Sequence, residues 1–109
     1  MKYNIIVSEH FKREFKNLLK KHSSLKNDLL LFEENIEKEL MLTTSLGDGF
    51  KKIRLNIASK GKGKSGGARI ITYETILNVA NKNVVLASIY DKSKNSSIDI
   101  AILKKILDL

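Results

Sequence analysis

The centre of the chain reads Lys60-Gly61-Lys62-Gly63-Lys64-Ser65-Gly66-Gly67-Ala68-Arg69-Ile70-Ile71. Glycines and lysines alternate in its first half and predict a flexible, basic loop. The β-branched residues that follow predict a strand over 68–77. Ahead of the loop, apolar and polar residues alternate with a period of two, the apolar set being Ile53, Leu55 and Ile57 and the polar set Lys52, Arg54 and Asn56. This period is typical of a strand with one buried and one polar face. We therefore expect a row of basic side chains on the sheet face turned away from the core.

Hydrophobic patterns extend this arrangement in both directions. Upstream they predict a strand over 3–7, a helix that begins at Glu9 with Ser8 as its cap, a second helix over 25–40 and a loop over 43–49. Downstream they predict a turn within 79–83, a strand over 84–90 and a helix over 98–109, with Ser96 and Asp99 in a capping-box pattern. The predicted order is β-α-α-β-β-β-α, an α+β fold in a single domain that covers residues 1–109.

Length and composition narrow the class of protein. The chain has 109 residues, which corresponds to one domain. It has no cysteine, which excludes disulfides and thiolate metal sites, and its histidines and carboxylates do not follow metal-ligand spacing. We therefore expect no metal and no other cofactor. The apolar runs are too short for a bilayer span or a signal peptide, which predicts a cytoplasmic protein without a membrane partner.

Positive charge is concentrated around the central stretch. Lysine and arginine number 20 against 12 aspartate and glutamate residues, a net charge of +8. Residues 51–70 hold seven of the cations and no carboxylate, whereas residues 1–50 are neutral and residues 71–109 carry +1. Clustered like charges repel one another unless an anion binds among them, so this segment predicts an anion-binding site. The glycines allow the backbone to approach a phosphate chain closely.

Two other motifs are less specific. The triplet Gly63-Lys64-Ser65 resembles part of a nucleotide-binding P-loop, but Ala58 stands where that motif needs a glycine and a strand follows instead of a helix. The sequence therefore argues against a nucleotide triphosphatase. The broad apolar stripe of 98–109 has two interpretations, since it either closes the core or leaves a surface for a partner.

Histidines and tyrosines give no clear catalytic constellation. His10 and His22 lie outside the basic segment and are expected at the surface. Tyr73 and Tyr90 lie on predicted strands, where each either stacks on an RNA base or fills the core. Both interpretations stay open at the level of sequence.

Three segments together resemble the RelE/ParE superfamily of toxins from bacterial toxin–antitoxin modules. They are Lys52-Ile53-Arg54, the loop and strand over 60–71, and Ile89-Tyr90-Asp91-Lys92. The glycine–lysine loop before Gly-Ala-Arg is similar to the HigB-type branch, and the order of the elements matches as well. The resemblance implies a RelE-like, microbial RNase-like fold, in which an antiparallel sheet packs on two N-terminal helices and exposes a basic cleft.

The resemblance also implies a function. It points to the toxin of a type II toxin–antitoxin system, a ribosome-dependent mRNA endoribonuclease (mRNA interferase) that inhibits translation. Such toxins activate the ribose 2′-hydroxyl against its adjacent phosphate. The implied partners are mRNA, the ribosomal RNA of the 70S ribosome, and a cognate antitoxin, for which we expect a small helix-turn-helix protein.

Individual residues take roles by their match to the family motif. Arg69 corresponds to the arginine that starts the central strand and stabilises the phosphate in the transition state. Lys52 and Arg54 correspond to a basic pair on the neighbouring strand, and Lys92 to a basic residue after the last strand. We expect Lys52 to help take the 2′-proton while Arg54 and Arg69 hold the phosphate. Further RNA contacts are expected from Lys51, Lys60, Lys62, Lys64, Tyr73, Tyr90 and Lys94.

The chain also departs from the family pattern. Ser93 follows the loop lysine, where RelE-type toxins have an arginine, and the last predicted helix has no tyrosine to stack on the substrate base. Two alternatives are therefore kept. One is a non-catalytic RNA-binding or ribosome-binding module, or a degenerate toxin. The other is a ParE-like gyrase inhibitor, which is weaker because those relatives generally lack the lysine–glycine loop and the catalytic arginine.

Overall fold

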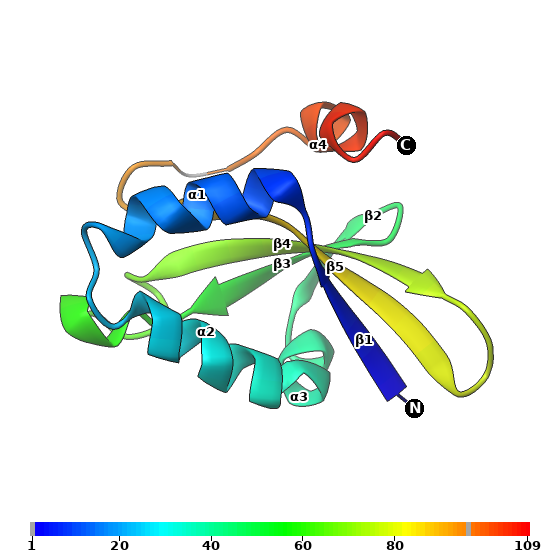
Figure 1. Cartoon of the computed structure of the whole chain (residues 1–109), viewed down its shortest axis with the longest axis horizontal. Coiled ribbons are helices and arrows are strands. Elements are labelled where there is room, and N and C mark those ends of the chain that lie inside the picture. Colours follow the sequence, from blue (N-terminus) through cyan, green and yellow to red (C-terminus); the bar gives the residue numbers. More distant parts are fainter. Residues whose placement is uncertain (1, 96) are drawn as a thin grey trace.

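Five strands and the helices around them make up the fold, in a computed structural model that describes residues 2–95 and 97–109 (Figure 1). The elements are, in chain order, β1 (Lys2–Val7), α1 (Glu9–Leu19), α2 (Leu25–Glu34), α3 (Ile36–Met41), β2 (Thr44–Gly47), β3 (Phe50–Leu55), a 3₁₀ turn (Ala58–Lys60), β4 (Ala68–Ile76), β5 (Asn81–Asp91) and α4 (Ile100–Ile106). The strands form one sheet in the order β1-β5-β4-β3-β2. The predicted α+β class is confirmed, and the observed order of elements differs in detail.

The sheet is mixed, so the expectation of an antiparallel sheet is wrong. β1 pairs with β5 in parallel, with Ile5 opposite Val84, whereas every other pairing is antiparallel. A parallel pair requires a long crossover, and here everything from α1 to β4 lies between the two strands. The predicted strand over 84–90 is confirmed as a central strand, and it begins three residues earlier at Asn81.

The helices α1, α2 and α3 cover one face of the sheet. The predicted cap of α1 is confirmed, because the Ser8 hydroxyl accepts a hydrogen bond from the Phe11 amide at 3.1 Å. Phe11, Leu25 and Phe32 from these helices pack against residues of β3, β4 and β5. The partners in the sheet include Ile53, Leu55, Ile70, Val84 and Leu86. This main core fixes which face of β3 is buried and which is free.

The second predicted helix, over 25–40, is two helices. It breaks at Asn35, whose φ of −110° and ψ of 22° lie outside the helical region. The Asn35 side-chain amide donates to the Leu31 carbonyl at 2.8 Å, and its backbone amide also donates to that carbonyl. An asparagine that bonds the backbone in this way competes with helix continuation. The break turns α3 toward β3.

The predicted loop over 43–49 contains a short edge strand, β2. Gly47 pairs with Phe50, so Asp48 and Gly49 form a two-residue turn. Both have positive φ, 54° and 85°, as a type I′ hairpin turn requires. The Asp-Gly pair was the signal for this hairpin, and β2 was missed because it is only four residues long.

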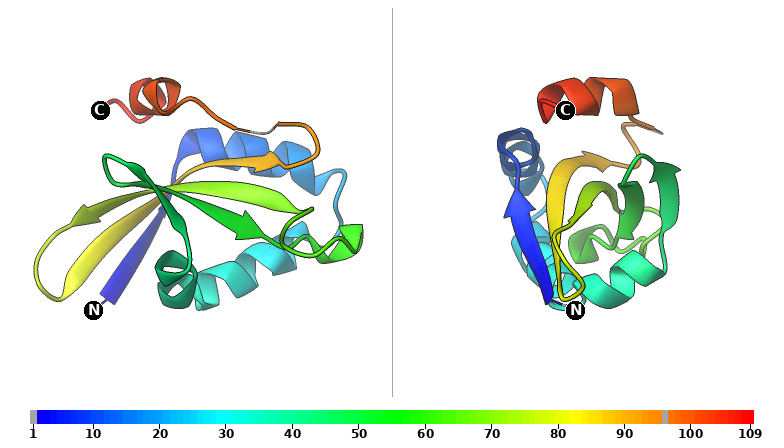
Figure 2. Two further views of the ribbon diagram at one scale, coloured as in Figure 1. Left: turned by 180° about the vertical axis from the view of Figure 1, so that it is seen from behind. Right: turned by 90° about the vertical axis from the view of Figure 1, so that its right-hand side faces the viewer.

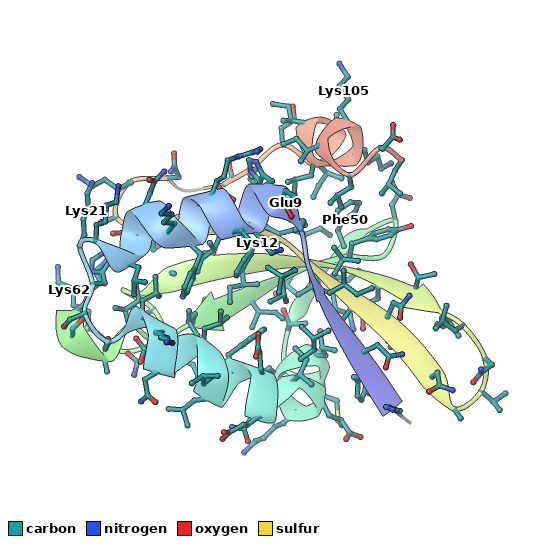
Figure 3. All side chains as sticks on the ribbon, in the orientation of Figure 1. Glu9, Lys12, Lys21, Phe50, Lys62 and Lys105 are labelled. Carbon is teal, nitrogen blue, oxygen red and sulfur yellow. The ribbon has the colours of Figure 1, made fainter. Side chains whose placement is uncertain are left out.

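The opposite face of the sheet is covered by α4 (Figure 2). Leu103 of α4 is fully buried in a second cluster with Phe50, Ile71, Ala87 and Tyr90. Figure 3 shows Phe50 beneath α4 and Lys105 projecting from its outer side. Of the two interpretations of the apolar stripe, closing of the core holds for Leu103.

The last helix is shorter than predicted. It covers residues 100–106, and Asp99 is its cap because Asp99 Oδ1 accepts from the Ala101 amide at 2.8 Å. The Ser96 half of the expected capping box lies outside the described residues. Ile102, Ile106 and Leu109 remain exposed.

Candidate nucleic-acid interface

Basic residues of β3 and β4 meet on the sheet face opposite the main core. Ile53 and Leu55 are buried, while Lys52 is half-buried and Arg54 exposed, so the predicted alternation along β3 is confirmed. Arg54 lies directly across from Arg69 of β4 in the strand register. Two cations in directly opposed positions destabilise a sheet unless an anion or a polar partner offsets their repulsion.

The outer edge of β3 opens into two adjacent cavities. β2 pairs with β3 only as far as Lys52, so the edge beyond Lys52 has no neighbouring strand. The larger cavity, about 280 Å³, is lined by Glu39, Leu42, Thr43, Thr44, Lys52, Ile53, Arg54 and Lys64. The smaller, about 120 Å³, shares Glu39, Arg54 and Lys64 and reaches Asp28 and Asn56. We call the two cavities together the basic groove.

One carboxylate, Glu39 of α3, lines both cavities of the basic groove. Lys64 Nζ lies 3.1 Å from Glu39 Oε1 and 3.4 Å from Oε2, which draws the glycine–lysine loop toward α3. Asp28 lines only the smaller cavity, and it is a buried structural residue whose Oδ2 accepts from the Ser24 hydroxyl and the Ala58 amide. The larger cavity is therefore lined by three cations, Lys52, Arg54 and Lys64, and by the Glu39 carboxylate, which pairs with Lys64.

Arg69 is held by the loop rather than by the groove. Its side chain is buried, and its guanidinium donates to the carbonyls of Lys64, Ser65 and Ala68, each at 3.1 Å. Burial lowers the pKa of Arg69, and the nearby charge of Arg54 lowers it further. Arg69 lines neither cavity of the groove. In this arrangement Arg69 shapes the loop, and Arg54 is the arginine that faces the groove.

The end of the loop passes very close to β3. A Cβ atom on Gly67 would lie 2.0 Å from the carbonyl oxygen of Leu55, so only glycine fits there. The Gly67 carbonyl in turn accepts from the Lys92 amide at 3.1 Å. These contacts bring the loop, β3 and the segment after β5 together at one end of the sheet.

Two of the predicted RNA-binding lysines are engaged in ion pairs. Lys51 Nζ lies 2.9 Å from Glu74 Oε2, on the face of the sheet that carries the main core. Lys60 Nζ lies 2.8 Å from Asp91 Oδ1, and the two side chains are only 11% and 6% exposed. Neither lysine lines the basic groove. Their acidic partners lie 23 and 31 residues further along the chain.

His22 belongs to the same buried network, so the expectation that it lies freely at the surface is wrong. Its Nε2 lies 3.2 Å from Asp91 Oδ2, and its side chain is 14% exposed. Ser93 also donates to Asp91 Oδ1 through its amide and its hydroxyl. Burial alone raises the pKa of Asp91, but the bonds from Lys60 and Ser93 and the charge of Lys60 outweigh it and hold the pKa well below the usual range.

Besides Lys64, three predicted lysines are exposed, namely Lys62, Lys92 and Lys94. Within the described residues, none of them has a carboxylate at ion-pair distance. Figure 3 places Lys62 and Lys21 at the same end of the molecule. Lys94 lines a separate cavity with Asn17 of α1, so it lies apart from the groove.

The two candidate stacking tyrosines are packed into the structure. Tyr90 is 5% exposed beneath α4, and its hydroxyl has no hydrogen-bond partner among the described residues. Burial raises the pKa of Tyr90, and Arg69 partly opposes that rise. Tyr73 is half-buried against Phe50, with ring centroids 5.0 Å apart. The core-filling interpretation of Tyr90 is therefore confirmed for this arrangement.

Two further features concern the described residues, namely groups of metal-ligand side chains and membrane-spanning helices. No group of three or more histidine, aspartate and glutamate side chains there is placed to hold a metal ion. None of the helices in that part of the chain has the length and apolarity to cross a membrane. No protein-family model matches the sequence. The function is therefore argued from the groove and its charges.

Proposed function

We propose that the protein is a RelE-like toxin of a type II toxin–antitoxin system, an endoribonuclease that cleaves mRNA on the ribosome. The observation that carries the proposal is the basic groove, in which Lys52, Arg54 and Lys64 surround a cavity of about 280 Å³ at an open sheet edge. The net charge of the groove favours a polyanion over a neutral ligand.

The chemistry that fits these residues is attack of a ribose 2′-hydroxyl on the adjacent phosphate. The transition state carries extra negative charge on the phosphate oxygens, which guanidinium and ammonium groups stabilise. Arg54 and Lys52 lie on one strand, two residues apart and on the same face, and both line the cavity that would hold the phosphate. This reaction needs no metal and no other cofactor.

The arrangement of elements supports the RelE-like part of the proposal. Helices α1 and α2 cover one face of the sheet, and the cations of β3 and β4 occupy the other, as the sequence resemblance implies. The parallel strand β1 is an addition to the antiparallel sheet that we expected. An antitoxin with a helix-turn-helix domain is the proposed protein partner, and an acidic segment of it would complement the groove.

A second candidate is an RNA-binding module without catalysis. It is favoured by the position of Arg69, whose guanidinium donates to three loop carbonyls instead of lining the groove. It is favoured also by Tyr90, which is covered by α4. In this alternative the groove binds a phosphate chain and leaves it intact.

The experiment is brief expression in bacteria, followed by mapping of RNA 5′ ends across the transcriptome. We expect new 5′ ends inside translated codons with the wild-type protein and their loss with Arg54→Ala. Arg13→Ala is the matched control, because Arg13 is an exposed arginine of α1 outside the groove. Ribosome binding without new 5′ ends would instead establish the non-catalytic module.

A further inference from the structure

Glu39 occupies an unusual place in the basic groove. It extends from the short helix α3, and its carboxylate lines both cavities together with Arg54 and Lys64. Its side chain is 18% exposed, so it is shielded but reachable from the groove. Within the described residues it is the one carboxylate that lines the larger cavity. A carboxylate that lines an anion site repels the anion and weakens its binding. Its presence in the groove therefore needs a chemical explanation.

The contact between Glu39 and Lys64 is one that an incoming phosphate would change. Lys64 Nζ lies within 3.4 Å of both carboxylate oxygens, and the lysine itself is more than half exposed. A phosphate in the larger cavity would compete with Glu39 for Lys64, because each is an anion within reach of the same flexible side chain. Substrate binding would therefore free a carboxylate oxygen beside the bound ribose.

We propose that Glu39 is the general base that takes the 2′-proton of the RNA. This role rests on the proposed function. The proton of the 2′-hydroxyl passes to the Glu39 carboxylate while the bond between the 2′-oxygen and phosphorus forms. The bond from phosphorus to the 5′-oxygen breaks, and that oxygen takes a proton from solvent. The products are a 2′,3′-cyclic phosphate and a 5′-hydroxyl end.

A carboxylate suits this role better than the lysine assigned to it from the sequence. An ammonium group donates hydrogen bonds only and has no free lone pair to accept a proton. A carboxylate oxygen accepts a proton directly. Lys52 is then left to stabilise the phosphate, in agreement with its place beside Arg54.

The test measures single-turnover cleavage of end-labelled mRNA on programmed 70S ribosomes. Removal of a general base is expected to slow cleavage by about 100-fold or more. The cleavage rate of the Glu39→Gln variant should therefore fall by that factor. Glu37→Gln is the matched control, because Glu37 lies in the same helix with an exposed side chain outside the groove. Cleavage by Glu39→Gln at the wild-type rate or faster would overturn the assignment.

Restoring the cleavage activity of a variant with an added carboxylate distinguishes a general base from a structural residue. Added acetate should restore part of the cleavage rate of Glu39→Ala, in proportion to its concentration, and should leave Arg54→Ala inactive. Slow cleavage by Glu39→Ala that acetate does not change would refute a base role and make Glu39 a structural residue. Absence of any cleavage by the wild-type protein would overturn the proposed function itself, so the two failures are distinguishable.

Discussion

At the scale of single residues, Asp91 holds three separate segments of the chain together through its side-chain contacts. It bonds Lys60 after β3, His22 between α1 and α2, and Ser93 after β5. Asp91 and Lys60 are both buried, so each leaves an uncompensated charge if the other is removed. This network holds the base of the glycine–lysine loop in position.

The depressed pKa of Asp91 makes folding stability depend on acid. A carboxyl group with a folded-state pKa below its unfolded value, near 3.9, stabilises the folded state fully above pH 4. That contribution is lost as pH falls below 4 toward the folded-state pKa. We expect the urea midpoint of the wild-type protein to fall between pH 4 and pH 2.

Asp91→Asn is expected to remove this contribution and to flatten the pH dependence over the same interval. At pH 7 the variant should unfold more easily, by about 3–5 kcal/mol, because Lys60 stays buried without its counter-charge. Asp108→Asn, an exposed position near the C-terminus, serves as the control. An unchanged midpoint at pH 7 in Asp91→Asn would show that the network contributes little.

Residue roles were predictable from sequence only where they follow from local pattern. The alternation along β3 placed Lys52 and Arg54 on the polar face correctly, because side chains alternate on any strand. The partners of Lys60 and Lys64 were not predictable, since Asp91 and Glu39 lie 31 and 25 residues away in the sequence. Glu39 in particular had no local signal that linked it to the basic segment.

At the scale of elements, α4 is attached to the sheet through a small contact. Leu103 is its one fully buried residue and packs on Phe50, Ile71 and Tyr90. The neighbouring Ile102 and Ile106 remain exposed. Leu103 is therefore the most deeply buried contact of α4 over Tyr90, and the partly buried Ile100 and Leu107 pack beside it.

Leu103→Ala should destabilise the protein by about 2–5 kcal/mol, the usual cost of a large-to-small change in a core. The measurement is the free energy of unfolding in urea. Ile102→Ala in the same helix is the control and should change that free energy by no more than about 0.5 kcal/mol, because Ile102 is 53% exposed. Equal effects of the two substitutions would contradict the packing of α4 described here.

Element types were easier to predict than element boundaries and pairings. Every strand except β2 follows from the hydrophobic period, and the first helix follows from that period and from the Ser8 cap. The break at Asn35 depends on one side-chain hydrogen bond. The apolar period over 25–40 continues through this position and predicts one uninterrupted helix. The parallel pairing of β1 with β5 joins residues about 80 positions apart, so no local pattern reports it.

At the scale of the whole molecule, ion pairs neutralise part of the positive charge that the sequence, with a net charge of +8, concentrates in one segment. Residues 51–70 carry +7 in the sequence, but Lys51, Lys60 and Lys64 each pair with a carboxylate from another segment. The cations left without such a partner near the groove are Lys52 and Arg54, within the described residues. The fold thereby reduces a broad basic segment to a compact group of unpaired cations at the edge of the sheet.

The central proposal is that the basic groove promotes attack of an RNA 2′-hydroxyl on the adjacent phosphate and so cleaves the RNA. The most direct measurement uses 70S ribosomes carrying either an all-ribose mRNA or the same mRNA with a single 2′-deoxy nucleotide at the cleaved position. We predict ribosome-dependent cleavage of the first, with a 2′,3′-cyclic phosphate at the new end, and none at the substituted position of the second. Cleavage at the deoxy position, or no cleavage of either RNA, would contradict the account.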